Sequence, residues 1–455
     1  MTCLIGEMEQ LISNEMLLST APNPSSNGQT TRLGTNALST IFLIVNATLG
    51  AGLLNFPQAF DKTGGLITAI GTQLILLIFI AAALIILANC SDITNTSSMQ
   101  DMFAKLYGQK SLFLCALCVT IYSFGCCLTF LIIVGDQFDR VLATYYGLDY
   151  CHTWYLARPF VTAITCSIFI LPLCFFKTLN ALSYTSSIGC ITICYVVWLV
   201  FYKNFTKVES PVNPMKIWPD NGFEVLQIIP VICFAYQSHM TAIPMYACMK
   251  ERNIGKFTLC AILSMIICFT AYTLVGICGY ATFGAGKVPS DILQGYTDRS
   301  VILLVAIIFI AIKNFTTYPI VLYCGRDALL SLLGMDINVT IKVRVFVTLI
   351  WYILSLIIAI LVPDISPIIN LLGALSAAFI FIFPGICLFQ STLLKDSELH
   401  LNKDRLLIFF AIFLTALGAF VSGVVFVEAV EDLHLTSKQV PLVTGFRQLR
   451  ESLCT

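Results

Sequence analysis

Charged residues are scarce in this chain and show no excess of either sign. Asp, Glu, Lys and Arg make up 11% of its 455 residues, and 25 basic side chains are balanced by 25 acidic ones. A soluble globular domain usually carries about 25% charged residues. The low charge excludes an ordinary soluble domain, and the lack of a basic stripe excludes nucleic acid as a partner.

Cysteine is common, but its distribution lacks the spacings that metal sites and disulfide scaffolds require. Of the 19 cysteines, 16 lie within apolar segments, and no repeated CxxC pair stands at zinc-site spacing. A thiol in such a segment behaves as a small hydrophobic side chain. With no catalytic dyad among the intramembrane polar residues either, we predict no metal site, no bound cofactor, no dense set of disulfides and no enzyme.

Apolar sequence is abundant, because 58% of the residues are hydrophobic. Eleven runs approach the roughly 20 residues that cross a hydrocarbon core. In chain order they are Leu38–Phe60, Leu66–Cys90, Leu112 to about Val134, Phe160–Phe176, Tyr184–Tyr202, Phe223–Met249, Phe257–Phe283, Val301–Tyr323, Val345–Val362, Ile365–Phe389 and Leu406–Val427. The sequence therefore predicts an all-α polytopic protein of the lipid bilayer with eleven transmembrane helices.

Polar tails flank this apolar region. Residues 1–35 are rich in Ser, Asn, Thr and Gly after Ser19, a composition typical of a disordered tail. Residues 36–427 form the predicted transmembrane domain, and residues 428–455 a polar C-terminal tail. The first apolar run is too long and too late for a cleaved signal peptide.

The N-terminal tail carries one short pattern with a functional interpretation. Glu7 stands four residues before Leu11 and Ile12, the spacing of the acidic dileucine signal that clathrin adaptors read on cytosolic tails. The alternative interpretation is a frayed amphipathic turn. The sorting interpretation favours a lysosomal or endosomal membrane, with the plasma membrane as the alternative.

The distribution of basic residues indicates the orientation. With a cytosolic N-terminus, cytosolic segments hold 13 Lys and Arg residues against 8 on the other side, leaving aside the distant C-terminal tail. Positive residues near the spans favour the cytosolic side. We therefore expect the N-terminal tail in the cytosol.

The first apolar run contains an interruption. Its middle holds Gly50 and Gly52, each of which weakens a helix by about 1 kcal/mol. Unwound backbone at bilayer depth persists only where it is buried in protein or lines a polar cavity. The pattern predicts a broken helix with a ligand at the break.

A second interruption lies in the sixth run. Pro230 and Pro244 flank a polar Tyr-Gln-Ser-His group that ends at His239. Interrupted spans five apart are typical of an inverted repeat with its substrate at the midplane. Free N–H groups at a half-helix start suit a carboxylate and free carbonyls suit a small cation, so the pattern favours an amino acid carried with an ion.

The eighth run adds adjacent hydroxyls at Thr316 and Thr317, with Lys313 one turn earlier on the same face. Hydroxyl and amide oxygens, including that of Asn46, suit an alkali cation; the alternative for the threonines is bonding within the helix or to a neighbouring helix. A lysine this deep normally faces the bundle interior, where it can stand in for a bound cation, or it can snorkel to a headgroup.

Together these motifs resemble the sodium-coupled neutral amino acid transporters, the system A and N branch of the amino acid/auxin permease family. The similarity covers roughly Thr35 to Val427, and the sixth-run pattern is most similar to the lysosomal glutamine-exporting branch. The stretches that carry it are Asn46-Ala-Thr-Leu-Gly-Ala-Gly-Leu-Leu-Asn-Phe-Pro57, Ile132-Ile-Val-Gly-Asp-Gln137, Pro230-x-x-Cys-Phe-x-x-Gln-x-His239-x-x-x-x-Pro244, Thr316-Thr-Tyr-Pro319 and Phe383-Pro-Gly385.

The resemblance implies a leucine-transporter-type 5+5 inverted repeat with helices 1 and 6 discontinuous, working as a monomer by alternating access. It implies that sodium is a co-substrate, held by Asn46, Leu49, Thr316 and Thr317. The implied substrate-binding residues are Thr48, Gly50, Ala51, Gly52, Phe234, Ala235, Gln237 and His239. His239 can equally be a packing residue.

Several functions fit these features. A cation-coupled carrier of neutral amino acids, with glutamine and asparagine first among its substrates, explains both breaks and the hydroxyl pair. Lys313 stands where the family pattern leads us to expect a small or neutral residue, so a proton-coupled or uncoupled lysosomal exporter is an alternative. An amino acid sensor with the same pocket is another. A channel or a membrane enzyme fits least.

Overall fold

The structure of the protein, a computed structural model, describes residues 35–146, 153–175, 180–206, 211, 213–296, 300–335, 340–362, 366–395 and 402–439. These residues form helices joined by short connections, and the one strand-like pairing among them is a bridge between Thr35 and Met249. The predicted all-α class is confirmed. The sorting signal at Glu7, Leu11 and Ile12 lies outside the described residues.

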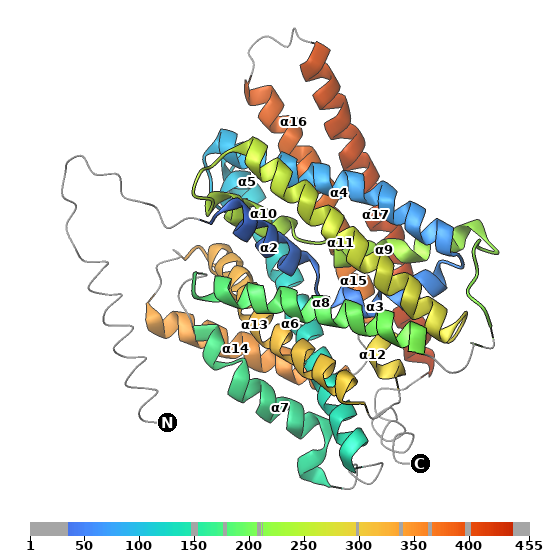
Figure 1. The fold of residues 1–455 in the computed structure, drawn as a ribbon. Coiled ribbons are helices and arrows are strands. Elements are labelled where there is room, and N and C mark those ends of the chain that lie inside the picture. Colours follow the sequence, from blue (N-terminus) through green and yellow to red (C-terminus); the bar gives the residue numbers. More distant parts are fainter. Residues whose placement is uncertain are drawn as a thin grey trace. The chain divides into compact units, whose positions relative to one another are not determined.

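The first predicted span is broken where its glycines indicated. Helix α2 (Ala37–Thr48) ends before Leu49, and α3 (Gly52–Lys62) starts at the second glycine. The two pieces are bent by 56° relative to each other (Figure 1). Residues 49–51 therefore form an unwound segment inside an apolar span.

The sixth predicted span is broken as well. A 3-10 turn (Gly222–Ile228) leads into α9 (Ile229–Ala235), and the chain unwinds before α10 (His239–Ala247). Pro230 sits at the start of α9, where its missing N–H is tolerated, and Pro244 lies inside α10. The break thus falls on the polar residues between the prolines rather than at either proline.

The two breaks lie against each other. A Cβ atom added to Gly52 would lie 2.7 Å from the Cβ of Ala235 and 2.9 Å from its Cα. Only a residue without a side chain allows the start of α3 to approach the end of α9 this closely. The discontinuous first and sixth helices therefore meet inside the bundle, as the sequence predicted.

Long helices enclose this contact. They are α4 (Leu66–Thr94), α6 (Gln109–Tyr146), α8 (Asn180–Thr206), α11 (Ile254–Phe283), α13 (Val301–Leu332), α14 (Ile341–Leu361), α15 (Ser366–Ala377) with α16 (Phe383–Lys395), and α17 (Asn402–Gln439). Helix α11 packs along α2, α3 and α4, and α13 packs along α6 and α8. The short elements of the described fold include α5 (Met99–Tyr107), α7 (Arg158–Phe169), α12 (Ile292–Gly295) and 3-10 turns at Trp154–Leu156 and Pro172–Phe175.

The predicted count of eleven spans is not confirmed among the described residues. Nine stretches of helix there are long and apolar enough to cross a membrane, with Gly222–Ala247 counted as one, and the bent α2–α3 pair makes a tenth. The fourth predicted span, Phe160–Phe176, appears as the 12-residue α7 followed by a 3-10 turn at Pro172–Phe175. Pro172 lacks the N–H that a continuing helix needs, which accounts for the early end of α7.

Two further features were not predicted. The tenth span contains a π-helical turn, Ala378–Ile382, between α15 and α16. Helix α5 follows α4 as a separate amphipathic helix, and the side chain of Ser98 caps it by accepting from the Asp101 amide. Neither changes the position of the breaks.

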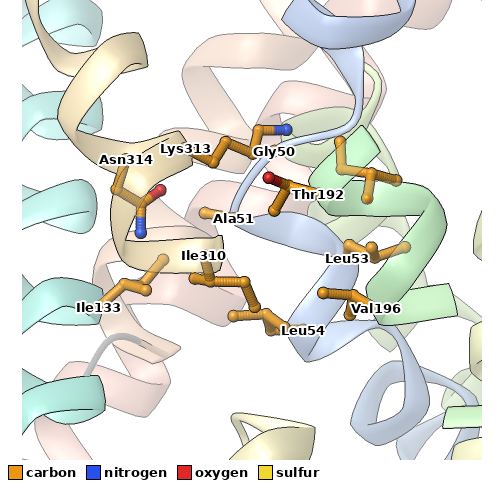
Figure 2. Close-up of a pocket in the computed structure, with 11 residues that line it drawn as sticks. Gly50, Ala51, Leu53, Leu54, Ile133, Thr192, Val196, Ile310, Lys313 and Asn314 are labelled. Atoms are coloured by element: carbon orange, nitrogen blue, oxygen red, sulfur yellow. The ribbon is translucent and has the colours of Figure 1, made fainter. Parts of the chain in front are cut away.

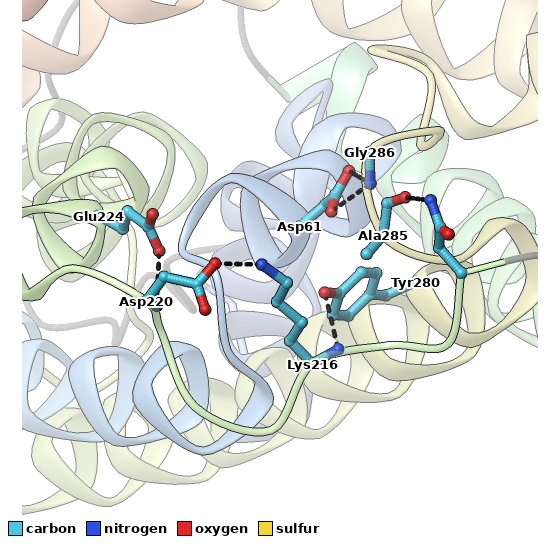
Figure 3. A network of polar contacts seen from close by, with 8 residues as sticks. Asp61, Lys216, Asp220, Glu224, Tyr280, Ala285 and Gly286 are labelled. Atoms are coloured by element: carbon cyan, nitrogen blue, oxygen red, sulfur yellow. Dashed lines mark hydrogen bonds and ion pairs between the residues drawn. The ribbon is translucent and has the colours of Figure 1, made fainter.

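A polar network holds the end of α3 that lies away from the break (Figure 3). The Gly286 amide donates one bifurcated hydrogen bond to the two carboxylate oxygens of Asp61, at 2.9 and 3.0 Å. The Lys216 amide donates to the hydroxyl of Tyr280 at 3.0 Å, and the Lys216 side chain pairs with Asp220. Helix α3 therefore has contacts at both ends: Asp61 bonds Gly286 at one end, and Gly52 packs against Ala235 at the break.

Substituting Gly52 tests how closely the two breaks must approach. Because an added methyl group would overlap the backbone of Ala235, Gly52→Ala is expected to lower the free energy of unfolding by about 1–3 kcal/mol. The matched control is Gly71→Ala in α4, where an added Cβ meets nothing within 4 Å. Unfolding in mixed micelles measures both, and equal stabilities would refute the close approach.

Candidate functional site

The unwound segment presents free backbone donors. The amides of Ala51 and Gly52 donate to no acceptor among the described residues, whereas the next two amides bond back to Gly50 and Ala51. These free donors stand at the start of α3, an 11-residue helix whose dipole is positive at this end. The combination is suited to a carboxylate.

A small cavity adjoins the segment (Figure 2). Its volume is about 20 Å³, which is enough for about one water molecule. It is lined by Gly50, Ala51, Leu53, Leu54, Ile133, Thr192, Ile193, Val196, Ile310, Lys313 and Asn314. The cavity therefore joins the break in the first span to α6, α8 and α13.

Lys313 is the one lysine or arginine in this lining. Its side chain extends from α13 toward Gly50 and is only 4% exposed (Figure 2). The Nζ atom has no hydrogen-bond partner among the described residues. Of the two positions that the sequence allowed, the bundle interior is confirmed and a snorkelling side chain is excluded.

The residues of the predicted sodium site lie on two elements. Asn46 and Leu49 are at the end of α2, and the Asn46 Oδ1 atom is buried, without a hydrogen bond in the described structure. Thr316 and Thr317 lie on α13, and both hydroxyls donate to the carbonyl of Lys313, at 2.9 and 2.8 Å. The threonines thus make the within-helix bonds that were the alternative interpretation, while both lone pairs of each hydroxyl oxygen remain to accept.

The predicted substrate residues of the sixth span surround the second break. Phe234, Ala235 and Gln237 are buried there. His239 is fully buried, with Nδ1 3.0 Å from Gln237 Oε1 and Nε2 3.2 Å from the Ile80 carbonyl of α4. The imidazole thereby links the second break to α4.

Tyr272 of α11 connects the two breaks. Its hydroxyl lies 2.8 Å from the carbonyl of Thr48, the last residue of α2, and 2.8 Å from that of Ala235, the last residue of α9. Its fully buried ring stacks on Phe56 of α3 with centroids 4.5 Å apart. One hydroxyl hydrogen thus serves two helix ends that both lack intrahelical donors.

Sequence reasoning missed Tyr272. It stands in the middle of the seventh apolar run, where its hydroxyl is one of the few polar atoms. A buried tyrosine usually finds a hydrogen-bond partner, so its place in an apolar run indicated that its hydroxyl bonds another polar group. The identity of the partners could not be read from the sequence, because Thr48 and Ala235 are distant along the chain.

The fold and this site define a polytopic membrane protein whose two discontinuous helices offer unpaired main-chain groups beside a buried lysine. The model of the transmembrane amino acid transporter protein family matches residues 34–428. The chain belongs to this family. The predicted class, a transporter of amino acids rather than an enzyme, is confirmed.

Relatives with curated names are similar along nearly the whole chain. A zebrafish (Danio rerio) protein named sodium-coupled neutral amino acid transporter 7 is 35% identical, covering 88% of this chain and 88% of its own length. The human protein of that name is 34% identical, covering 92% and 93%. A mouse protein named solute carrier family 38 member 8 is 30% identical, covering 78% and 84%. The predicted resemblance is confirmed.

Tyr272→Phe tests the link between the breaks. The ring remains, but two buried carbonyls lose their shared donor, so the free energy of unfolding is expected to fall by about 1–3 kcal/mol. Amino acid transport by the remaining folded protein should fall as well, because the two helix ends are no longer held together.

The control for this variant is Tyr107→Phe, which also removes one tyrosine hydroxyl that donates to a carbonyl, that of Ile386 at 2.7 Å. It lies on α5, away from the breaks, and should leave transport per folded molecule unchanged. Equal transport by the two variants would mean that the hydroxyl of Tyr272 has no part in the transport cycle.

Proposed function

We propose that this protein carries neutral amino acids, with glutamine and asparagine as its main substrates, by alternating access. The observation that carries the proposal is the contact between two discontinuous helices, with the free amides of Ala51 and Gly52 at its centre. The names of the relatives, which specify neutral amino acids, support it.

The substrate site of this proposal lies between the two breaks. The amides of Ala51 and Gly52 bind the carboxylate, with Thr48 and Gly50 beside them, and Phe234, Ala235, Gln237 and His239 face the rest of the substrate. Gln237 Nε2, buried and without a partner among the described residues, is a donor for a side-chain amide oxygen. A glutamine or asparagine side chain offers such an oxygen.

Alternating access is supported by the burial of the proposed substrate site. Ala51, Phe234 and Gln237 are each at most 8% exposed. The elements around them must therefore move apart to admit a substrate. The proposed framework for this movement is the eleven-helix, 5+5 inverted repeat with its two broken helices at equivalent positions.

A cation site is the second part of the proposal. It lies between the end of α2 and α13, where Asn46, Leu49, Thr316 and Thr317 supply oxygen atoms from two elements that can move relative to each other. Sodium appears in the names of the relatives. A cation held between the two elements would favour the closed form of the substrate site.

Flux measurements on purified protein test the transport proposal. Proteoliposomes should take up radiolabelled glutamine in a saturable manner, with competition by asparagine. Binding without flux would indicate an amino acid sensor and would contradict the proposal. The informative variant is Ala51→Pro, because proline adopts the φ of −55° that Ala51 has and its nitrogen carries no hydrogen to donate.

The proposed carboxylate contact predicts a specific kinetic result for this variant. Loss of one hydrogen bond to a charged group should lower kcat/KM for glutamine by about ten- to hundredfold. Ala51→Gly keeps the N–H and serves as the matched control, with uptake close to that of the unaltered protein. If Ala51→Pro and Ala51→Gly lower kcat/KM equally, the Ala51 amide does not bind the substrate carboxylate.

We further propose a lysosomal or endosomal location, with a clathrin adaptor binding Glu7, Leu11 and Ile12, and a monomeric transporter. Replacing Leu11 and Ile12 by Ala should shift a tagged protein toward the cell surface, measured by surface biotinylation. The control is the Leu17–Leu18 pair, which has Ser13 in the acidic position of the pattern. If replacing Leu17 and Leu18 by Ala gives the same surface fraction as replacing Leu11 and Ile12, no adaptor recognises the proposed signal.

A further inference from the structure

The ammonium group of Lys313 lies in an environment that is costly for a charge. Its Nζ atom is buried, and among the described residues it forms no hydrogen bond and no ion pair. No carboxylate is among the residues that line its cavity. A buried cation without a carboxylate requires compensation from main-chain or side-chain dipoles, or it marks a functional site.

The end of α2 supplies such dipoles. A helix of 12 residues presents its negative end where α2 stops, and the carbonyls of Asn46 and Ala47 accept no backbone hydrogen bond among the described residues. Asn46 Oδ1 is also buried and without a partner there. The oxygen atoms near this helix end thus exceed the donors that the described residues provide.

Lys313 reaches toward this oxygen-rich end from a different helix. Its side chain crosses from α13 to Gly50, the residue that follows the end of α2 (Figure 2). Gly50, Ala51 and Lys313 line one cavity, with Thr192 of α8 on its edge. A positive charge placed here interacts with the broken helix and with α13 at the same time, which is what a coupling cation between these elements would do.

We propose that the ammonium group of Lys313 is the resident cation of the site between α2 and α13, so that amino acid transport by this protein proceeds without sodium. The inference rests on the proposed transport function and specifies its cation. The two threonines agree with it, because their hydroxyl hydrogens bond the Lys313 carbonyl and hold this turn of α13 in place. The protein's own side chain supplies the positive charge, so no cation is taken up from solution.

Ion replacement with radiolabelled glutamine in proteoliposomes tests the proposal. The unaltered protein should take up glutamine equally well, within about twofold, when choline replaces sodium. Lys313→Ala removes the ammonium group and leaves a space that a sodium ion can fill. Its uptake should therefore become sodium-dependent, at least about tenfold higher in sodium than in choline.

Lys313→Met is the matched control. The methionine side chain fills most of the same volume but brings no charge and leaves no space for an ion. Its uptake should fall at least about tenfold in both media. Sodium should also raise the midpoint of thermal unfolding of Lys313→Ala by about 1–3 °C, while leaving the unaltered protein and Lys313→Met unchanged.

The outcomes separate the two levels of the proposal. Saturable uptake by the unaltered protein that disappears in choline would overturn the role of Lys313 while leaving the transport function intact. Normal uptake by Lys313→Met in choline would overturn it as well. No uptake of any neutral amino acid in either medium would overturn the transport function itself. The measurements on the unaltered protein decide even if Lys313→Ala does not fold.

Discussion

The structure depends on the close contact between two interrupted helices. Hydrocarbon supplies no hydrogen-bond partners, so an unwound segment at this depth must be satisfied by protein or by a ligand. Part of the requirement is met by Tyr272, whose hydroxyl serves the carbonyls at the ends of α2 and α9. The amides of Ala51 and Gly52 and the carbonyls of Asn46 and Ala47 are left for a zwitterion and a cation.

This arrangement separates the two charges that the site handles. Free donors gather at the positive start of α3, and free acceptors gather at the negative end of α2, only a few residues earlier in the chain. A carboxylate and an ammonium or metal cation can therefore bind at neighbouring points of one unwound segment. Lys313 is the only ionisable side chain in the described cavity lining, and it comes from α13, a helix that packs mainly along α6 and α8.

Much of this could be predicted from local sequence. Glycine at positions 50 and 52 and the polar residues between Pro230 and Pro244 locate the breaks because their effects on a helix are local. The sequence left two positions for Lys313, the bundle interior and a headgroup, because both avoid exposing an ammonium group to lipid. Tyr272 and the contact between Gly52 and Ala235 could not be predicted, because they depend on which distant segments become neighbours. The short fourth helix was missed because its span was predicted from apolar composition alone, without regard to Pro172. The π-helical turn depends on backbone packing that composition does not specify.

The central claim is that an amino acid binds between the two breaks. An experimentally determined structure of the protein with bound glutamine, at a resolution that shows side chains, tests it most directly. The account predicts the substrate carboxylate within hydrogen-bond distance of the amides of Ala51 and Gly52, with the remainder of the substrate against Phe234 and Gln237. Glutamine bound elsewhere, with the unwound segment of the first span empty, would contradict it.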